Sequence, residues 1–216
     1  MVEHMVEPKA GHVPGMATSL AEPIAGIELI LGGQKSGKSR RAEHLANAWL
    51  AGAEVNGHPR QATLIATAQP WDAEMRQRIA RHQADRARRV PGMATLEEPL
   101  ALAAALARLS APHHLLVVDC LTLWLTNWLM PAESISQEKM SYSQDGIEVF
   151  APLIESLDAA PGPVVLVGNE IGLGVIPMGT EVRHFVDTLG QLNQAVAAIS
   201  QRVVLMVAGL PLGLKP

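Results

Sequence analysis

The chain has 216 residues, of which 48% are hydrophobic and 18% charged, and its formal net charge is −4. This length and composition predict one folded domain with a substantial core and exclude a disordered chain. The negative net charge excludes the basic surface typical of nucleic-acid-binding proteins, and one Tyr and two Phe are too few to build base-stacking platforms. We therefore expect a globular protein without a nucleic-acid partner.

The first segment, residues 1–24, contains acids, histidines and prolines but no apolar core of a secretory signal. We expect a mobile N-terminal extension there and one domain over residues 25–216. The longest apolar stretch, Leu115–Met130, is broken by Asp119 and other polar side chains, so we expect no membrane span. The lone cysteine, Cys120, excludes an internal disulfide and favours a reducing, cytoplasmic location. Its place after an apolar strand favours a small buried hydrophobe over a reactive thiol.

The first predicted strand, Ile27–Leu31, leads into a glycine loop and then into a predicted helix, Arg40–Leu50. The loop matches G-x-x-x-x-G-K-[ST] and consists of Gly32, Gly33, Gln34, Lys35, Ser36, Gly37, Lys38 and Ser39. Glycines let successive backbone N–H groups turn inward and form an anion-binding nest at the positive end of a helix. Lys38 can reach the β- and γ-phosphates, and the Ser39 hydroxyl can ligate Mg²⁺. We interpret the loop as a nucleotide-binding P-loop, the alternative being a glycine-rich turn before an ordinary helix.

A second strand is predicted at Ala62–Thr67, after which Pro70 opens a charged helix that runs to about Arg88. Four residues share one side of this helix at helical spacing: Met75, Ile79, His82 and Arg86. Arg78 precedes His82 by about one turn, and an imidazole flanked by guanidinium groups is disfavoured as a cation. His82 could thus attack a phosphate that the arginines bind. Spacing alone favours a solvated amphipathic helix, so both interpretations stay open.

The next predicted elements are a helix at Leu100–Leu109, a strand at Leu115–Asp119 and an apolar helix at Leu121–Met130. Asp119 ends its apolar strand as a Walker B acid does, and a carboxylate there can orient the Mg²⁺ shell. The alternative is a strand-end acid that caps the next helix. The pair His113-His114 lacks the spacing of metal ligands and is interpreted as structural.

The rest of the chain continues the alternation of strands and helices. It comprises an exposed loop at 131–145, a helix at Ile147–Leu157, a strand at Pro163–Gly168, a glycine-rich loop at 169–180, a helix at 181–199 and a strand at Val203–Val207. Glycines in the loop 169–180 permit close approach of the backbone to a ligand, and Asn169 and Glu170 are placed to contact polar groups of a substrate. An ordinary flexible connection is the alternative.

The predicted strands are continuous apolar runs separated by helices, which indicates a mostly parallel sheet with helices on both faces. Ligands of such sheets bind beyond the carboxyl ends of the strands, where the glycine loop lies. We therefore expect the α/β class and a single P-loop NTPase domain of the RecA-like type, without a second core.

Six blocks of the sequence resemble the bifunctional adenosylcobinamide kinase/adenosylcobinamide-phosphate guanylyltransferases of cobalamin biosynthesis. The blocks are GGQKSGKSRRAEHLA, IATAQPWDAEMRQRIARHQADR, TLEEPL, LLVVDCLTLWLTNWL, VVLVGNEIGLGVIP and RHFVDTLGQLNQAVAA. The resemblance implies that ATP or GTP phosphorylates the aminopropanol hydroxyl of adenosylcobinamide. It further implies that GTP donates GMP through a covalent guanylyl-histidine to give adenosyl-GDP-cobinamide.

The same resemblance implies the site residues. The guanylylated histidine corresponds to His82, and Lys38 is the second catalytic residue. Nucleotide contacts are implied throughout the P-loop and at Ala66, Thr67, Ala68, Gln83, Ala84, Asp85, Arg86, Glu97 and Asp119. Mg²⁺ is implied at Ser39 and Asp119, and a homotrimer is implied as the assembly.

Two other functions remain open from the residues alone. One is a P-loop kinase for a small molecule with a single activity, in which His82 is a surface residue. The other is a nucleotide-gated binding protein without transfer chemistry.

Overall fold

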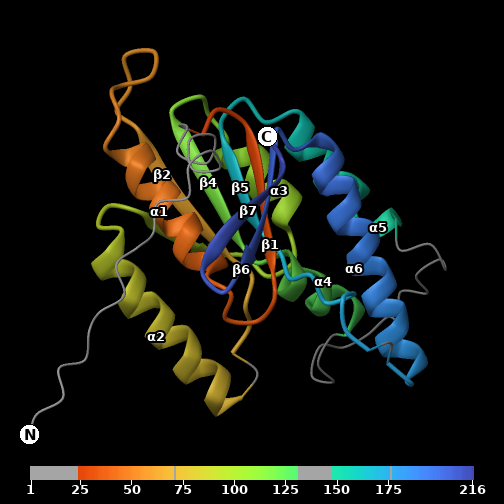
Figure 1. The fold of residues 1–216 in the computed structure, drawn as a ribbon. Coiled ribbons are helices and arrows are strands. Elements are labelled where there is room, and N and C mark those ends of the chain that lie inside the picture. The colour runs from red at the N-terminus through yellow and green to blue at the C-terminus, as the bar shows by residue number, and fades with distance from the viewer. Residues whose placement is uncertain (1–23, 71, 131–146, 176) are drawn as a thin grey trace, which may run out of the picture.

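The computed structural model describes residues 24–70, 72–130, 147–175 and 177–216, which form an α/β domain around one sheet (Figure 1). The sheet contains β1 (Ile27–Gly32), β2 (Gln61–Ala66), β3 (Ala94–Glu97), β4 (His114–Asp119), β5 (Val164–Val167), β6 (Arg202–Val207) and β7 (Leu210–Lys215). Its strand order is β3-β2-β4-β5-β1-β6-β7, and every pair is parallel except β6 with β7. The predicted mostly parallel sheet is confirmed.

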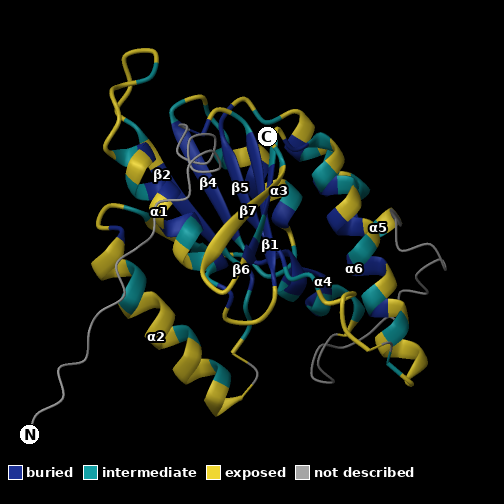
Figure 2. Cartoon of the chain, in the orientation of Figure 1, coloured by how far each residue is buried: buried dark blue, intermediate teal, exposed yellow. Residues whose placement is uncertain are grey.

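Helices cover both faces of this sheet, as predicted (Figure 1). The helix α1 (Lys38–Leu50) packs on one face. The opposite face carries α3 (Leu102–Leu109), α4 (Leu121–Leu129), α5 (Ile147–Asp158) and α6 (Thr180–Ile199). The remaining helix, α2 (Ala73–Arg89), lies beyond α1 and contains no buried residue (Figure 2). Within the described residues, no helix has both the length and the apolar character needed to cross a membrane.

The central strands are mainly apolar because both of their faces are buried. In β4, Leu115 and Val117 pack in the core under α1, whereas Leu116 and Val118 pack in the core under α3–α6. The same alternation repeats in β1, β5 and β6. The continuous apolar runs in the sequence therefore arise because helices cover both faces of these strands, as predicted.

One charged residue, Glu28, lies within these buried strands and is 1% exposed. Its Oε1 accepts hydrogen bonds from Nε and Nη2 of Arg41 at 2.9 and 2.7 Å, and its Oε2 accepts one from Arg202 Nη1 at 3.0 Å. A buried charge is tolerated when it is paired and hydrogen-bonded in this way. Glu28 thus ties β1 to α1 and to β6.

The start of α2 and the edges of the sheet differ from the prediction. The helix begins at Ala73 rather than at Pro70, because the Asp72 carboxylate accepts the Met75 N–H at 2.6 Å and caps the first turn. The strands β3 and β7 were not predicted. The expected loop at 131–145 and residues 1–23 of the expected N-terminal extension lie outside the described residues. Ile24, the last residue of that extension, is buried in the core under α1.

Candidate active site

The P-loop connects β1 to α1, and its backbone requires glycine at two of its three glycine positions. Gly37 has φ 102° and Gly32 has φ 151°, both on the positive side that glycine adopts at little cost. A Cβ on Gly32 would lie 2.6 Å from the Met206 carbonyl oxygen, so the chain has no room for a side chain there. Gly37 precedes α1 without a side-chain cap, which leaves the first N–H groups of the helix available to an anion.

Two polar side chains of the loop are buried and directed toward the loop itself. Lys38 is 8% exposed, and its Nζ donates a hydrogen bond to the Gly33 carbonyl oxygen at 2.7 Å. Burial lowers the pKa of Lys38 below its usual range, while the charge of Asp119 acts in the opposite direction. The Ser36 hydroxyl is buried and has no hydrogen-bond partner within the part of the chain that the structure describes. The loop therefore holds a cation and an unsatisfied hydroxyl beside the helix terminus, as an anion site requires.

Asp119 ends β4 at the same edge of the sheet as the P-loop. The register pairs Asp119 with Val167 of β5 and Val167 with Ile30 of β1, so one strand separates the acid from the P-loop strand. The carboxylate has no hydrogen bond or ion pair to any described residue. The N-cap of α4 is Cys120, without a side-chain cap bond, so the structure does not show the capping role considered for Asp119. Burial lowers the pKa values of Lys38 and Arg86, and the charge of Asp119 opposes this lowering in both.

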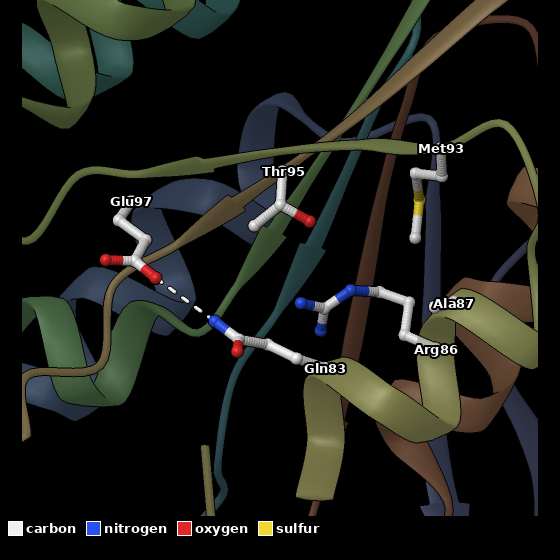
Figure 3. A pocket seen from close by; sticks show the side chains of 6 residues that line it. All are labelled: Gln83, Arg86, Ala87, Met93, Thr95 and Glu97. Carbon is white, nitrogen blue, oxygen red and sulfur yellow. Dashed lines mark hydrogen bonds between the residues drawn. The ribbon is translucent and has the colours of Figure 1, made fainter. Parts of the chain in front are cut away.

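A pocket of about 350 Å³ lies between α2 and the segment around β3 (Figure 3). Its lining residues are Gln83, Arg86, Ala87, Met93, Thr95 and Glu97. Gln83 Nε2 donates a hydrogen bond to Glu97 Oε1 at 3.1 Å across the pocket, and the Arg86 guanidinium points into it. Burial lowers the pKa of Arg86, while Asp119 and Glu43 oppose this shift. Asp119 is thus close enough to interact electrostatically with the P-loop lysine and with the arginine of the pocket.

The structure brings together three of the contacts that the family resemblance implied, namely Gln83, Arg86 and Glu97. Asp85 does not line the pocket and pairs with Arg88 at 2.5 Å instead. Ala84 is exposed on the same helix. Sequence reasoning missed Ala87, Met93 and Thr95 as lining residues, although strand alternation would place Thr95 on the same face as Glu97.

The contacts expected after β2 are close to the end of β4. Ala66 pairs with Asp119 in the sheet, and Thr67 and Ala68 follow directly. Thr67 is fully buried, and its Oγ1 donates to the Cys120 carbonyl oxygen at 2.8 Å and accepts the Cys120 N–H at 2.9 Å. The Thr67 side chain therefore holds the ends of β2 and β4 together. Its backbone N–H and carbonyl are also bonded within the protein, to the Asp119 carbonyl oxygen and to Asn127 Nδ2.

His82 lies on the exposed part of α2, one residue before Gln83 of the pocket. Of the four residues predicted to share one side of the helix, Met75, Ile79 and Arg86 are half-buried and His82 is exposed. The C-terminal end of α2 is attached to α1 by two contacts. Arg89 Nη1 lies 3.0 Å from Glu43 Oε2, and Asn47 Nδ2 donates to the Arg89 carbonyl oxygen at 2.5 Å.

The loop after β5 begins beside the P-loop. The Glu170 N–H donates to the Gly32 carbonyl oxygen at 3.3 Å, and the Asn169 N–H donates to Thr122 Oγ1 at 2.9 Å. Asn193 Nδ2 of α6 donates to the Asn169 carbonyl oxygen at 3.1 Å. Hydrogen bonds to β1, α4 and α6 therefore position the start of this loop.

The other residues considered from the sequence are structural. His114 Nε2 lies 2.8 Å from Thr63 Oγ1 in the interior, and the His113 ring stacks on His58. In the described ranges, no three His, Cys, Asp or Glu residues are grouped so that they could hold a metal ion. Burial raises the pKa of the Cys120 thiol to about 12, so the prediction of a buried, unreactive cysteine is supported.

Known proteins resemble this chain over most of its length. The model of a family described as cobinamide kinase / cobinamide phosphate guanyltransferase matches residues 28–214. The chain is 46% identical over 188 residues to the bifunctional adenosylcobalamin biosynthesis protein CobP of Pseudomonas aeruginosa, with 87% of this chain and 96% of that protein covered. It is 33% identical over 194 residues to the bifunctional adenosylcobalamin biosynthesis protein CobU of Salmonella typhimurium, with 87% and 98% covered. The family match extends from β1 into β7.

Proposed function

This chain belongs to the cobinamide kinase / cobinamide phosphate guanyltransferase family, and from that membership we propose which parts of its site carry out each of the two reactions. ATP or GTP at the P-loop phosphorylates the aminopropanol hydroxyl of adenosylcobinamide. GTP then gives GMP to His82, from which the cobinamide phosphate takes it to form adenosyl-GDP-cobinamide. The observation that carries this proposal is the position of Asp119 in the sheet. One strand separates it from Glu97 of the pocket beside His82, and one strand separates it from β1, which leads into the P-loop. Its charge also favours the charged forms of Lys38 and Arg86 against the effect of burial.

In the kinase reaction, the P-loop binds and positions the triphosphate. Lys38 exchanges its bond to the Gly33 carbonyl for a phosphate oxygen, and the free N–H groups at the start of α1 bind the same group. Phosphoryl transfer depends mainly on such positioning and on neutralising negative charge. The Lys38 amine and the N–H groups at the start of α1 meet both the need for positioning and the need for neutralisation, and the fold already holds them in place.

The residues present fit a magnesium ion. Ser39 and Asp119 would hold it. Both are half-buried, both carry a side-chain oxygen that can ligate a metal ion, and neither side chain has a hydrogen-bond partner among the described residues. Mg²⁺ prefers hard oxygen ligands and retains several waters, so two protein ligands suffice beside a nucleotide. When bound, the ion supplies neutralisation of the phosphate charge.

In the guanylyl transfer, the His82 imidazole attacks the α-phosphorus of GTP and pyrophosphate leaves. A phosphate oxygen of the cobinamide phosphate then attacks the resulting phosphoramidate and releases His82. The covalent step divides a difficult displacement into two easier ones. The exposure of His82 beside the pocket formed by Gln83, Arg86 and Glu97 supports this role.

We also propose that the protein is a homotrimer located in the cytoplasm and that it has no nucleic-acid partner. The trimer is supported by the family resemblance and by α2, whose lack of buried residues leaves a surface for a neighbouring subunit. The location is supported by the single, buried thiol of Cys120.

The test is to incubate the full chain with Mg²⁺ and GTP labelled at either the α- or the γ-phosphorus, and to measure label retained after denaturation. We expect α-label but no γ-label, in a bond that acid breaks and base does not, as in a histidine phosphoramidate. His82→Ala should abolish the α-label and GDP-cobinamide formation while sparing much of the kinase activity. Lys38→Ala should severely impair both reactions, because both need the triphosphate.

His44→Ala is the matched control, because His44 is an exposed histidine on α1. This variant should label as the wild type does. Persistent α-label in His82→Ala would move the nucleophile to another residue. A wild type that takes up no α-label would leave a kinase with a single activity as the better function.

A further inference from the structure

The loop after β5 carries an acid, Glu170, near its start, beside the first residue of the P-loop. In the strand order, β5 separates β1, which carries the P-loop, from β4, which carries Asp119. Gly168 N–H donates to the Ile30 carbonyl oxygen at 2.9 Å, and Glu170 N–H donates to the Gly32 carbonyl oxygen at 3.3 Å. Glu170 is therefore attached by its backbone to the first residue of the P-loop, at the edge of the sheet where ligands of parallel sheets bind.

The Glu170 carboxylate is oriented by neighbouring groups. Its Oε1 accepts the Gly172 N–H at 3.1 Å, and its Oε2 lies 3.5 Å from Asn193 Nδ2. Asn193 is 4% exposed, and the same Nδ2 donates to the Asn169 carbonyl oxygen. A buried amide on α6 thus holds both the backbone and the carboxylate of this short segment.

The carboxylate still has free acceptor sites. It offers about four lone-pair positions, of which these two contacts use two. No described lysine or arginine forms an ion pair with it. An unpaired carboxylate beside a phosphate-binding loop repels the phosphates of a nucleotide and so weakens nucleotide binding. The repulsion is relieved when a hydrogen-bond donor lies between the carboxylate and the phosphates. The hydroxyl of an acceptor alcohol supplies such a donor.

We propose that Glu170 is a catalytic residue of the phosphoryl transfer, which accepts the hydrogen bond of the acceptor alcohol and takes its proton. This inference rests on the proposed kinase function. The alcohol oxygen forms a bond to the γ-phosphorus, and the bond from that phosphorus to the β–γ bridging oxygen breaks. The nucleoside diphosphate leaves with the electron pair, and the hydroxyl proton passes to a carboxylate oxygen of Glu170 and then to solvent.

Glu170→Gln tests the proposal, because the glutamine can still accept the Gly172 N–H but is a poor proton acceptor. Three activities are measured on each variant: phosphorylation of adenosylcobinamide by ATP, α-labelling by GTP, and guanylyl transfer to purified adenosylcobinamide phosphate. We expect the kinase kcat to fall about 100-fold or more, the usual contribution of a general base. The KM for ATP should change little, and the other two activities should persist. Glu170→Asp should restore part of the kinase kcat, and Glu181→Gln at the exposed start of α6 should have no effect.

Three outcomes would overturn the assignment of Glu170. The first is a kinase kcat within threefold of the wild type in Glu170→Gln. The second is an equal loss of all three activities, which would assign the residue to the shape of the loop. The third is a raised KM for ATP at unchanged kcat, which would assign it to nucleotide binding. A wild type without α-label is a separate result, which refutes the guanylyl-histidine and leaves the kinase comparison valid.

Discussion

At the scale of single residues, Asp119 acts on both the P-loop and the pocket. Its carboxylate forms no hydrogen bond to the described residues, and its charge acts on Lys38 of the P-loop and on Arg86 of the pocket. Burial lowers the pKa values of both cations, and Asp119 opposes that shift in each case. One acid therefore supports the charge of the two cationic groups that would meet the nucleotide.

Replacing Asp119 by Asn should raise the Mg²⁺ concentration needed for activity and leave the fold intact. It should also lower the pKa of Lys38 further, since the anion that favours the charged amine is gone. Lys38 then loses its proton at a lower pH, so nucleotide binding should decline earlier on the alkaline side. Both effects are measured as the half-saturating Mg²⁺ concentration and as the pH profile of nucleotide affinity.

Asp119→Glu provides the conservative comparison and should be much milder, because it keeps the charge. Asp158→Asn, at the exposed end of α5, is the matched control for the loss of one acid. An Asn variant with unchanged Mg²⁺ dependence would show that Asp119 serves neither the ion nor the phosphates.

At the scale of elements, the central strands could be predicted from the sequence because their apolar runs are long and unbroken. The two edge strands could not. β3 has only four residues and no buried one. β7 alternates leucines with other residues, but Pro211 and Gly213 lie within it, and both residue types are depleted in strands. Of the site, the P-loop and Asp119 follow from local motifs. The meeting of Gln83 and Glu97 depends on how α2 and β3 pack, which no local pattern records.

The buried Glu28 gives a prediction for the same elements. Glu28→Ala should lower the free energy of unfolding by about 3–5 kcal/mol, because it leaves Arg41 and Arg202 in the interior without their carboxylate. Urea unfolding of the purified chain measures the loss. Glu155→Ala, an exposed acid on α5, should change stability by less than about 0.5 kcal/mol. A Glu28→Ala variant as stable as this control would show that the three-residue cluster does not tie the elements together.

At the scale of the whole molecule, buried polar side chains support both ends of the sheet. At the carboxyl end, Thr67, Asn127 and Asn193 bond to the backbone of the loops that form the site. At the opposite end, His114 is buried at the start of β4 and bonds to Thr63. The site therefore lies at an edge of the sheet that these hydrogen bonds support. The opposite end of the sheet contains the His114 imidazole, whose ionisation is linked to folding.

This linkage predicts how stability depends on pH. Burial, assisted by the neighbouring His113, lowers the pKa of His114 below 6.5, so the folded state favours the neutral ring. As the pH falls below about 6.5, the unfolded chain binds a proton that the folded chain resists, and stability decreases by up to about 1.4 kcal/mol per pH unit from this group. Above that pH its contribution is constant. Urea unfolding at pH 7 and pH 5 should show a smaller acid loss in His114→Gln than in the wild type, and equal losses would contradict the assignment.

The exposure of α2 has a consequence for how this helix varies in evolution. Packing constrains the sequence of most helices, because each buried side chain must fit its neighbours. α2 has no buried residue and is attached at one end through Arg89, so packing imposes little constraint on its outer positions. Outer positions of α2 that stay invariant among related sequences are therefore retained for chemistry or for contact with another subunit. At these positions, conservation is a direct record of function.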